Sequence, residues 1–518
     1  MGRQRGSVTS PYTMVSMNPE RNRGTSINLL AFVGMAAVLA IAQFSHDHIV
    51  GSDGFFHIEQ AARITTNSMT WMPLSVFADG WVDHQLVFHA LLAPLAWLLP
   101  KVIAAKLAAV LLGAAGLTML WSALRRQGAP LPFLIALLPV ALSWQFLVRL
   151  EMPRAQGLSL ALLLACVIAL LEGRARLLFV LCWIYAWTYQ VALLVLPIAL
   201  LHSLVSRLPI GVEPPRRAWA GPFAAAAGLI AGFVVHPHSP GTLRFLWQHV
   251  VLKVLNRSEL PVGGEWEAGG ITTLLETGLG GIACLITASV LLMRLARSPE
   301  IPASRSTVFA VLLAASATVG ALLSTKFIEY SIPFSAFALG LALRDLRRRR
   351  DGVTTRWRVL CSAALAACIL WSGIEARDAI QRTEPETQRL APAMEWASEH
   401  IPAGDRIYHF SWNDWPELVF HGPAWEYIVG LDPHFLALAD PDLWTLYDKI
   451  GRGWGKNPSK PIAERFRARW AILVLPYPGE PRELLDADPG LILRFEDPSA
   501  VVYEVVTVPL GPDVSPEL

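Results

Sequence analysis

The sequence predicts a mainly helical, polytopic membrane bundle followed by a small C-terminal α/β domain. Hydrophobic residues make up 53% of the 518 residues and charged residues only 16%, well below the ~25% charge of a typical soluble protein. The apolar residues form blocks of the length that crosses a bilayer as a helix. From residue 375 onward the chain is instead charged and rich in proline, which indicates a separate soluble domain.

About eleven apolar blocks fit membrane spans, and the positive charges between them predict an orientation. The blocks are 27–44, 84–100, 101–123, 130–148, 156–172, 177–205, 218–235, 271–293, 306–325, 327–343 and 357–374. The block at 177–205 suits either one tilted helix or two short helices broken near Tyr189. Arginines in the N-terminal tail (1–26) and in the loop 344–358 place both segments in the cytoplasm. Because eleven is odd, residues 375–518 are then external.

This orientation has consequences for the other loops. It places RLEMPRAQG (149–157) on the cytoplasmic side, although it also leaves Arg125–Arg126 and Arg174–Arg176 outside, against the rule. Within the membrane domain (27–374) the long external loops are 45–83 and 236–270. All histidines except His202 fall in or at the edge of the external segments, so polar chemistry is expected on one face.

The charge balance and the cysteines limit which partners and metal ligands the polar segments can have. With 43 basic and 41 acidic residues, the balance does not favour a nucleic-acid partner. All five cysteines lie in apolar blocks and none forms a CxxC pair. Any metal in the polar segments would therefore be held by oxygen or imidazole ligands.

The first external loop carries the main candidates for catalysis. In SDGFFHI (52–58), Asp53 and His57 are four residues apart and share one face of a helix. Asp83 and His84 stand at the mouth of the next apolar block. A carboxylate here can act as a general base toward an alcohol or hold a divalent cation such as Mg²⁺ or Mn²⁺, with Asp53 as the candidate ligand. The alternatives are helix capping for the two aspartates and interfacial hydrogen bonding for the two histidines.

A second polar cluster follows residue 235. His236 and His238 lie in HPHSP, and Arg244, His249 and Lys253 then recur at helical spacing. A basic stripe beside a membrane is suited to a lipid-linked phosphate. Ordinary snorkelling of long basic side chains is the alternative.

A third cluster lies in KFIEYSIP (326–333). Lys326 and Glu329 sit between two spans at the predicted outer surface. Lys326 is a further candidate for the donor phosphate, and Glu329 a weaker candidate for the site. A structural ion pair between these two residues, three positions apart, is the alternative.

The C-terminal segment predicts a small α/β unit. Helices are expected at 386–401, 416–421, 441–451 and 461–468, strands at 406–411 and 470–476, and a closing hairpin at LILRFED and AVVYEV. It contains no glycine-rich phosphate loop and no nucleophile elbow. Trp412, Asp414, Trp415 and Asp432 are either lining for a sugar site or ordinary core and capping residues.

Together these features resemble the GT-C superfamily of integral-membrane glycosyltransferases. The order of one span, a loop opening with an aspartate, further spans and an external α/β domain is similar, and SDGFFHI, HPHSP, KFIEYSIP and FSWNDWPELVF are similar to its short motifs. The resemblance implies that Asp53 serves as base or metal ligand and that Asp83 assists. It also implies a sugar donor carried on a polyprenyl phosphate. The chain departs from the family at His236 and His238, and it has no clear second acidic pair in a later loop.

The expected function is glycosyl transfer, with inversion, at the external face of the plasma (bacterial inner) membrane. The donor would be a polyprenyl-phosphate sugar, bound by Arg244, His249, Lys253 and Lys326, and the acceptor a glycan, lipid or protein. The rival is a non-enzymatic transporter, flippase or scaffold for lipid-linked sugars. A transporter would place functional polar residues within the bilayer, often in paired repeats.

Overall fold

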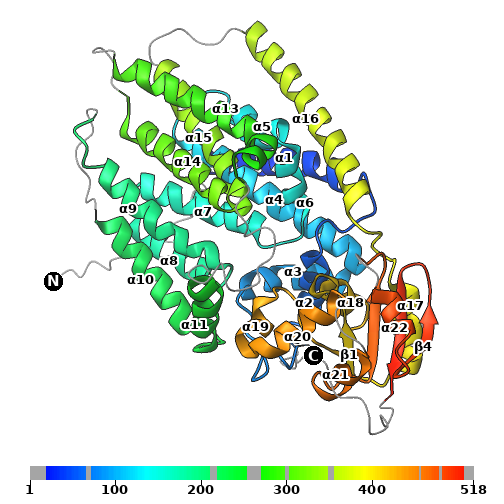
Figure 1. Ribbon diagram of the computed structural model, residues 1–518. Helices are drawn as coiled ribbons and strands as arrows, with labels where there is room; N and C mark the ends of the chain where they lie inside the picture. Colours follow the sequence, from blue (N-terminus) through cyan, green and yellow to red (C-terminus); the bar gives the residue numbers. More distant parts are fainter. Residues whose placement is uncertain are drawn as a thin grey trace, which may run out of the picture.

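Helices make up most of the structure, and the sheet lies in the C-terminal segment (Figure 1). The computed structural model describes residues 19–65, 72–210, 219–253, 270–297, 303–347, 355–453, 457–477 and 481–506. The expected class, a helical membrane bundle with a small C-terminal sheet domain, is confirmed.

The apolar helices differ in length. The helices of the bundle are α1 (Pro19–Gln43), α4 (Lys101–Arg126), α5 (Pro132–Leu142), α6 (Trp144–Glu151), α7 (Gln156–Leu171), α8 (Ala175–Ala186), α9 (Val195–Val205), α10 (Ala220–Val235), α13 (Gly270–Ala296), α14 (Arg305–Leu323), α15 (Ile328–Arg347) and α16 (Thr355–Thr383). Among the described residues, five helices are long and apolar enough to cross a membrane, or six if the bent pair α5–α6 is one span. Six further apolar helices have only 10–17 residues. The structure therefore does not confirm eleven spans.

One end of the bundle gathers arginines, and we call it the arginine-rich end. Arg125 donates to Asn28 at 3.3 Å, and Arg126 donates to Glu172 at 2.8 Å. Arg344 donates to the Gln127 carbonyl at 3.1 Å. Arg125, Arg126 and Arg174 thus share an end with the start of the first apolar helix. The expectation that they lie on the opposite side was wrong.

The cause of that error is the segment 84–100, which does not cross the bundle. It forms α3 (Leu86–Leu98), a helix of 13 residues that lies beside α2 (Asp53–Ala62). Near its start His89 contacts His57, and near its end Trp97 Nε1 donates to the Ala62 carbonyl at 3.0 Å. Both ends of α3 therefore lie at the end of the bundle that carries α2, which we call the α2 end.

The block at 177–205 forms two helices. α8 ends at Ala186, Tyr189 is extended, and a 3₁₀ turn (η1, Gln190–Leu194) leads into α9. Of the two options left open by the sequence, the structure has the break at Tyr189.

The segment 149–157 lies at the α2 end, after a sharp bend between α5 and α6. α5 and α6 meet at 94°, where Ser143 accepts a hydrogen bond from the Phe146 amide at 3.1 Å and caps α6. Arg154 then pairs with Asp53 and Glu151 with His46. The expectation that this segment lies on the opposite side from Asp53 was wrong, because it counted 84–100 as a span, whereas α3 does not cross the bundle.

The C-terminal domain is built on one five-stranded sheet of order β2-β1-β3-β5-β4. Its strands are β1 (Arg406–His409), β2 (Glu426–Tyr427), β3 (Trp470–Val474), β4 (Leu491–Glu496) and β5 (Ala500–Val505). β1 is parallel to β2 and β3, and β5 pairs antiparallel with β3 and β4. The expected strands and closing hairpin are present, and the short strand β2 is additional.

The helices of this domain largely follow the sequence pattern. They are α17 (Ala391–His400), α18 (Trp415–His421), α19 (His434–Ala439), α20 (Pro441–Gly451), α21 (Ser459–Glu464) and α22 (Pro481–Asp486). The helix expected at 461–468 ends by residue 464, and α19 and α22 were not anticipated.

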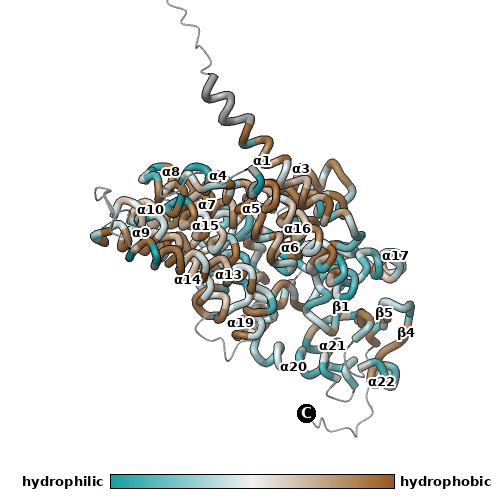
Figure 2. The backbone as a smooth tube through the Cα atoms, turned by 90° about the horizontal axis from the view of Figure 1, so that it is seen from above, coloured by the Kyte–Doolittle hydropathy of each residue, from teal (hydrophilic) through white to brown (hydrophobic). Residues whose placement is uncertain are grey.

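Aromatic contacts dock the domain on the α2 end of the bundle. The rings of Phe56 and Trp415 lie 5.3 Å apart, and those of Phe55 and Phe420 lie 5.2 Å apart in an edge-to-face arrangement. The Ile49 amide donates to Thr387 Oγ1 at 2.9 Å. Figure 2 shows the hydrophobic helices on one side and the more hydrophilic domain beside them. The candidate residues lie at this junction.

Candidate active site

Helix α2 presents Asp53 at its first turn and His57 one turn later. Asp53 occupies the first helical position, where a carboxylate is favoured by the helix dipole. Gly54 lets this turn approach the loop after α6, since a Cβ there would lie only 2.4 Å from Pro153 Cγ. The close approach brings Arg154 against the Asp53 carboxylate.

Asp53 is held by a buried arginine. Arg154 Nε lies 3.3 Å from Asp53 Oδ2, with the Arg154 side chain 9% and the Asp53 side chain 33% exposed. The Asp53 carboxylate is therefore charge-paired yet still reachable from solvent. Nearby, burial raises the pKa of Glu384, although a hydrogen bond from the Gly51 backbone and the charge of Arg154 oppose the rise.

Asp83, His89 and His57 form a buried chain of hydrogen bonds. His89 Nδ1 lies 2.9 and 2.8 Å from the two oxygens of Asp83, and His89 Nε2 lies 3.0 Å from His57 Nδ1. The Gln85 amide also donates to Asp83 at 2.9 Å. All three members of the chain are at most 4% exposed. Helix α3 thus connects Asp83 to the helix that carries Asp53.

The charges in this chain follow from burial and pairing. Burial alone would raise the pKa of Asp83, but the charge and hydrogen bond of His89 lower it to about 2. Burial lowers the pKa of His57 well below its ordinary value, and His89, Arg154 and His84 act in the same direction. At neutral pH Asp83 is therefore ionised and His57 is neutral in this chain of hydrogen bonds.

His84 points away from this chain toward the segment after α10. Its ring stacks on Phe245 at 4.0 Å and lies 6.4 Å from the ring of His249. Burial lowers the pKa of His84 to about 4, partly offset by Asp83. His84 is thus a neutral side chain between two parts of the site.

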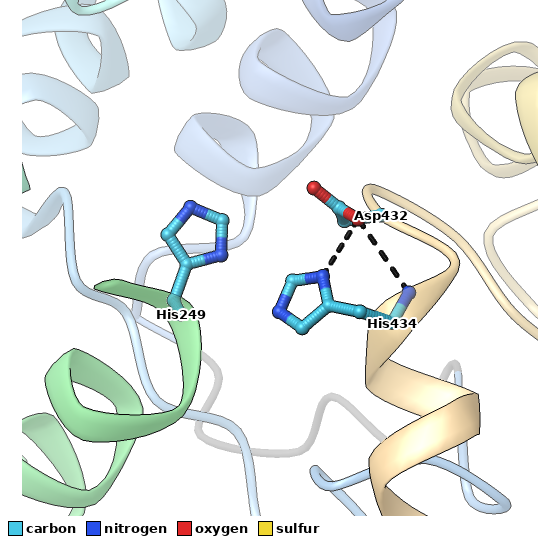
Figure 3. Close-up of side chains that lie close together, drawn as sticks. All are labelled: His249, Asp432 and His434. Carbon is cyan, nitrogen blue, oxygen red and sulfur yellow. Dashed lines mark hydrogen bonds and ion pairs between the residues drawn. The ribbon is translucent and has the colours of Figure 1, made fainter. Parts of the chain in front are cut away.

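A second cluster joins the bundle to the C-terminal domain (Figure 3). His249, on the π-helical turn η2 (Trp247–Leu252), faces Asp432 and His434 at the start of α19. One ligand atom from each of the three lies within 4.8 Å of the others, and all three residues are buried. Lys253 Nζ, from a side chain 1% exposed, donates to Asp432 Oδ2.

The Lys253 ammonium decides whether this cluster can hold a metal ion. Burial lowers the pKa of both imidazoles, and neutral imidazole with carboxylate is a ligand set for zinc-like ions rather than for Mg²⁺. However, the Lys253 ammonium already neutralises Asp432 inside the cluster. As arranged, the residues form an ion pair with two imidazoles and do not fit a divalent ion unless Lys253 moves away.

Arg244 lies apart from that cluster. Its side chain is 61% exposed and is 3.7 Å from Asp79, itself 89% exposed. It lines a pocket of about 290 Å³ together with Trp81, His238 and Gln248. The basic stripe expected along Arg244, His249 and Lys253 is therefore divided between an open pocket and a buried ion pair.

The remaining candidates lie around the same end. Lys326 is close enough to His249 to lower the pKa of that imidazole. Glu329 accepts a hydrogen bond from Arg149 at 2.7 Å. His236 is buried against Trp187, with ring centroids 5.4 Å apart, and its Nδ1 accepts from the His238 amide at 3.1 Å.

The weaker candidates in the C-terminal domain serve mainly its core. Trp415 is fully buried against Phe56, so it does not line an open sugar site. Asp414 Oδ2 is buried and accepts no hydrogen bond from the described residues. Burial raises the pKa of Asp414 to about 7.

Sequence reasoning missed the partners that organise the site. The sequence predicts Arg154 on the opposite side and gives no role to His89 or His434. The i,i+6 spacing of Asp83 and His89 across a helix start was the one available signal for the chain.

Comparisons with known proteins define the class of the fold. No family profile and no curated protein sequence matches the chain. Solved structures do match, and they show that the fold is GT-C-like, as expected from the sequence motifs.

Three of these structures are similar over most of this chain. ArnT from Cupriavidus metallidurans, solved with undecaprenyl phosphate, has 14% identity and a TM-score of 0.59, over 94% of this chain and 99% of that one. The mycobacterial arabinofuranosyltransferase AftD has 17% identity and a TM-score of 0.56, over 92% of this chain. This chain spans only 40% of the length of AftD. The Archaeoglobus fulgidus oligosaccharyltransferase has 12% identity and a TM-score of 0.55, over 86% of this chain and 69% of that one.

Proposed function

We propose that this protein is a membrane glycosyltransferase that transfers a sugar from a polyprenyl-phosphate carrier to a hydroxyl acceptor at the α2 end. The observation that carries the proposal is the pairing, on a GT-C-like fold, of a reachable carboxylate with a buried acid–imidazole chain. Asp53, held by Arg154, begins the same helix that presents His57 to His89 and Asp83. A transporter would not need such a constellation at one surface.

The roles follow from charge and accessibility. Asp53 would accept a hydrogen bond from the acceptor hydroxyl and orient its oxygen toward the anomeric carbon. The glycosidic bond then forms as the bond from that carbon to the phosphate oxygen breaks, with the electron pair leaving on the polyprenyl phosphate. Attack from the face opposite the phosphate would invert the anomeric carbon.

The leaving phosphate needs positive charge. We assign this role to Arg244 and Lys326, because Lys253 is buried in its pair with Asp432. His249 is buried beside that pair and would position rather than bind the donor. In this proposal Asp53 holds no metal ion, since Arg154 Nε already lies 3.3 Å from its Oδ2. Because positive charge favours the cytoplasmic side, the arginine-rich end would face the cytoplasm and the α2 end would lie at the external face of the plasma membrane.

The test is a transfer assay on the full chain in nanodiscs. A panel of synthetic undecaprenyl-phosphate sugars, pentoses and hexoses, would be offered with mixed glycan and lipid acceptors. The release of undecaprenyl phosphate and the new glycoside would be followed by mass spectrometry. We expect turnover with at least one donor, and a loss of about 100-fold or more in Asp53→Asn and in Arg154→Ala.

Asp442→Asn, at an exposed position in the first turn of α20, is the matched control and should keep full activity. Full activity of Asp53→Asn would contradict the assigned site. Transport of the donor across the bilayer with no new glycoside would favour a flippase instead.

A further inference from the structure

The proposed function leaves open where the acceptor's proton goes, and this inference rests on that function. Asp53 is engaged by Arg154. His57 lies one helical turn away on the same face of α2, and it ends a chain of two imidazoles and one carboxylate. We propose that Asp83, His89 and His57 form a proton relay that receives the acceptor proton at His57 Nε2. In this relay His89 is the positioning residue, because it fixes the tautomer of His57 and takes up the positive charge.

The hydrogen bonds determine the resting protonation. Asp83 is ionised and can only accept, so His89 Nδ1 carries the proton in the bond at 2.8 Å. In a neutral His89, Nε2 then holds a lone pair and accepts from His57 Nδ1 across 3.0 Å. His57 Nε2 is left with a lone pair on the opposite edge of its ring. The chain thus selects the tautomer of His57 in which Nε2 is a base.

A charge on His57 itself would be costly. The ring is buried, and Arg154, His84 and His89 are the charged or titratable groups that act on it. None of these three attracts a cation. A lone histidine in this position would be a very weak base.

The relay removes this difficulty by moving the charge. When His57 Nε2 takes the acceptor proton, the proton on His57 Nδ1 can pass to His89 Nε2. His57 becomes neutral again, now protonated at Nε2, and His89 becomes an imidazolium within 2.8–2.9 Å of both Asp83 oxygens. One proton enters and none is lost, while the positive charge rests beside a carboxylate rather than in an apolar pocket. The reverse shift releases the proton after the products leave.

The surroundings of the chain are suited to this transfer. Phe56 and Phe88 pack against His57 with ring centroids 5.1 Å away, so water is excluded from the bonds between the imidazoles. Trp81 and Trp415 in turn pack on Phe56 at 5.7 and 5.3 Å. The C-terminal domain therefore helps to keep the relay dry, which strengthens its electrostatic interactions.

The first experiment determines the tautomers of the relay histidines without substrate turnover. The wild type in lipid bilayers, labelled with ¹⁵N-histidine and assigned with His57→Gln and His89→Gln, would be studied by solid-state NMR at pH 7. We expect Nδ1–H tautomers for both His57 and His89. Asp83→Asn should shift both histidines toward other tautomers, whereas Asp442→Asn should leave them unchanged. A wild-type His57 protonated at Nε2 beside a neutral His89 would overturn the proposal.

The second experiment uses the pH profile of kcat/KM with the active undecaprenyl-phosphate donor. Asp83→Asn removes the charge that supports the His89 imidazolium, so the relay becomes a weaker base. We expect a loss of about 100-fold or more and an acid limb that moves to lower pH by about one unit or more. A purely structural role would lower the activity without moving the limb. His400→Gln, an exposed histidine in the C-terminal domain, should match the wild type.

The two experiments separate the two proposals. If no donor is turned over, the proposed function fails, while the NMR tautomers still decide whether the relay exists. If turnover is found and the acid limb does not move in Asp83→Asn, the relay is wrong and the transferase stands.

Discussion

At the scale of single residues, burial decides which polar side chains are charged. Asp83 and Asp414 are both aspartates in aromatic surroundings, yet the pKa of the first is lowered to about 2 and that of the second is raised to about 7. The difference is the partner. Asp83 contacts His89 through both oxygens, whereas one oxygen of Asp414 is buried with no hydrogen bond from the described residues and Glu417 adds like charge.

Asp414 should make the stability of the C-terminal domain depend on pH. With its pKa raised from 3.8 to about 7 in the folded state, the native carboxyl keeps its proton where the unfolded one has lost it. Its contribution is fully present below about pH 4 and is lost as the pH rises toward 7. Asp414→Asn should therefore be more stable than the wild type at pH 8 by about 1 kcal/mol or more, and not at pH 4.

Thermal unfolding of the two proteins at pH 4, 6 and 8 would measure this difference. Asp442→Asn should unfold at the same temperature as the wild type at each of the three pH values. An equal gap between wild type and Asp414→Asn at every pH would show that Asp414 is already ionised in the folded protein.

Residue types in the sequence identified loops that the structure brings together, but not the pairs within them. Asp53, His57, Asp83 and His84 do gather at the α2 end, because SDGFFHI forms the expected helix. Arg154 joins them because α3 does not cross the bundle, which places the loop after α6 at the same end. Lys253 pairs with Asp432 instead of remaining available for the donor phosphate. Such pairings depend on segments far apart in the chain, which local spacing does not encode.

At the scale of elements, α3 shows why counting apolar blocks misassigns sides. LVFHALLAPLAWL is as hydrophobic as a span, but it has 13 residues and its two ends contact the same helix. Exposed side chains such as Leu91, Trp97 and Leu98 are suited to a helix lying in the membrane interface. The block 177–205 forms two helices, which is one of the two options that the sequence leaves open.

Labelling of single cysteines would test this arrangement. In a background without the five native cysteines, Asp79→Cys and Lys101→Cys lie on either side of α3, and Arg174→Cys lies at the arginine-rich end. A membrane-impermeant maleimide should label the first two from one side of oriented vesicles and the third from the other. Labelling of Asp79→Cys and Lys101→Cys from opposite sides would restore α3 as a span.

At the scale of the whole molecule, the buried Lys253–Asp432 pair couples the bundle to the C-terminal domain. Removing one partner leaves the other charge buried, which costs about 3–5 kcal/mol in comparable pairs. Lys253→Met and Asp432→Asn should each lower the stability strongly, and the double variant should lose less than the sum of the two. His249 and His434 would remain packed at 5.1 Å.

A double-mutant cycle on thermal unfolding in detergent, with limited proteolysis of the domain, would measure this coupling. Arg452→Met, from an exposed pair with Asp448, is the control and should cost less than about 1 kcal/mol. Additive losses in the cycle would show that Lys253 and Asp432 act independently.

The docking of the last domain on α2 also constrains the order in which the protein is made. Ile49 and Phe56 are among the first described residues to be synthesised, yet their partners Thr387 and Trp415 come more than 300 positions later. At about 5–20 residues per second, translation of that interval takes roughly 15 to 75 s. During this time the first loop has emerged without the aromatic cover that keeps its histidines dry. A nascent chain would thus carry the acidic and imidazole groups early but gain a sheltered site only after residue 415 has been made, which delays activity until then.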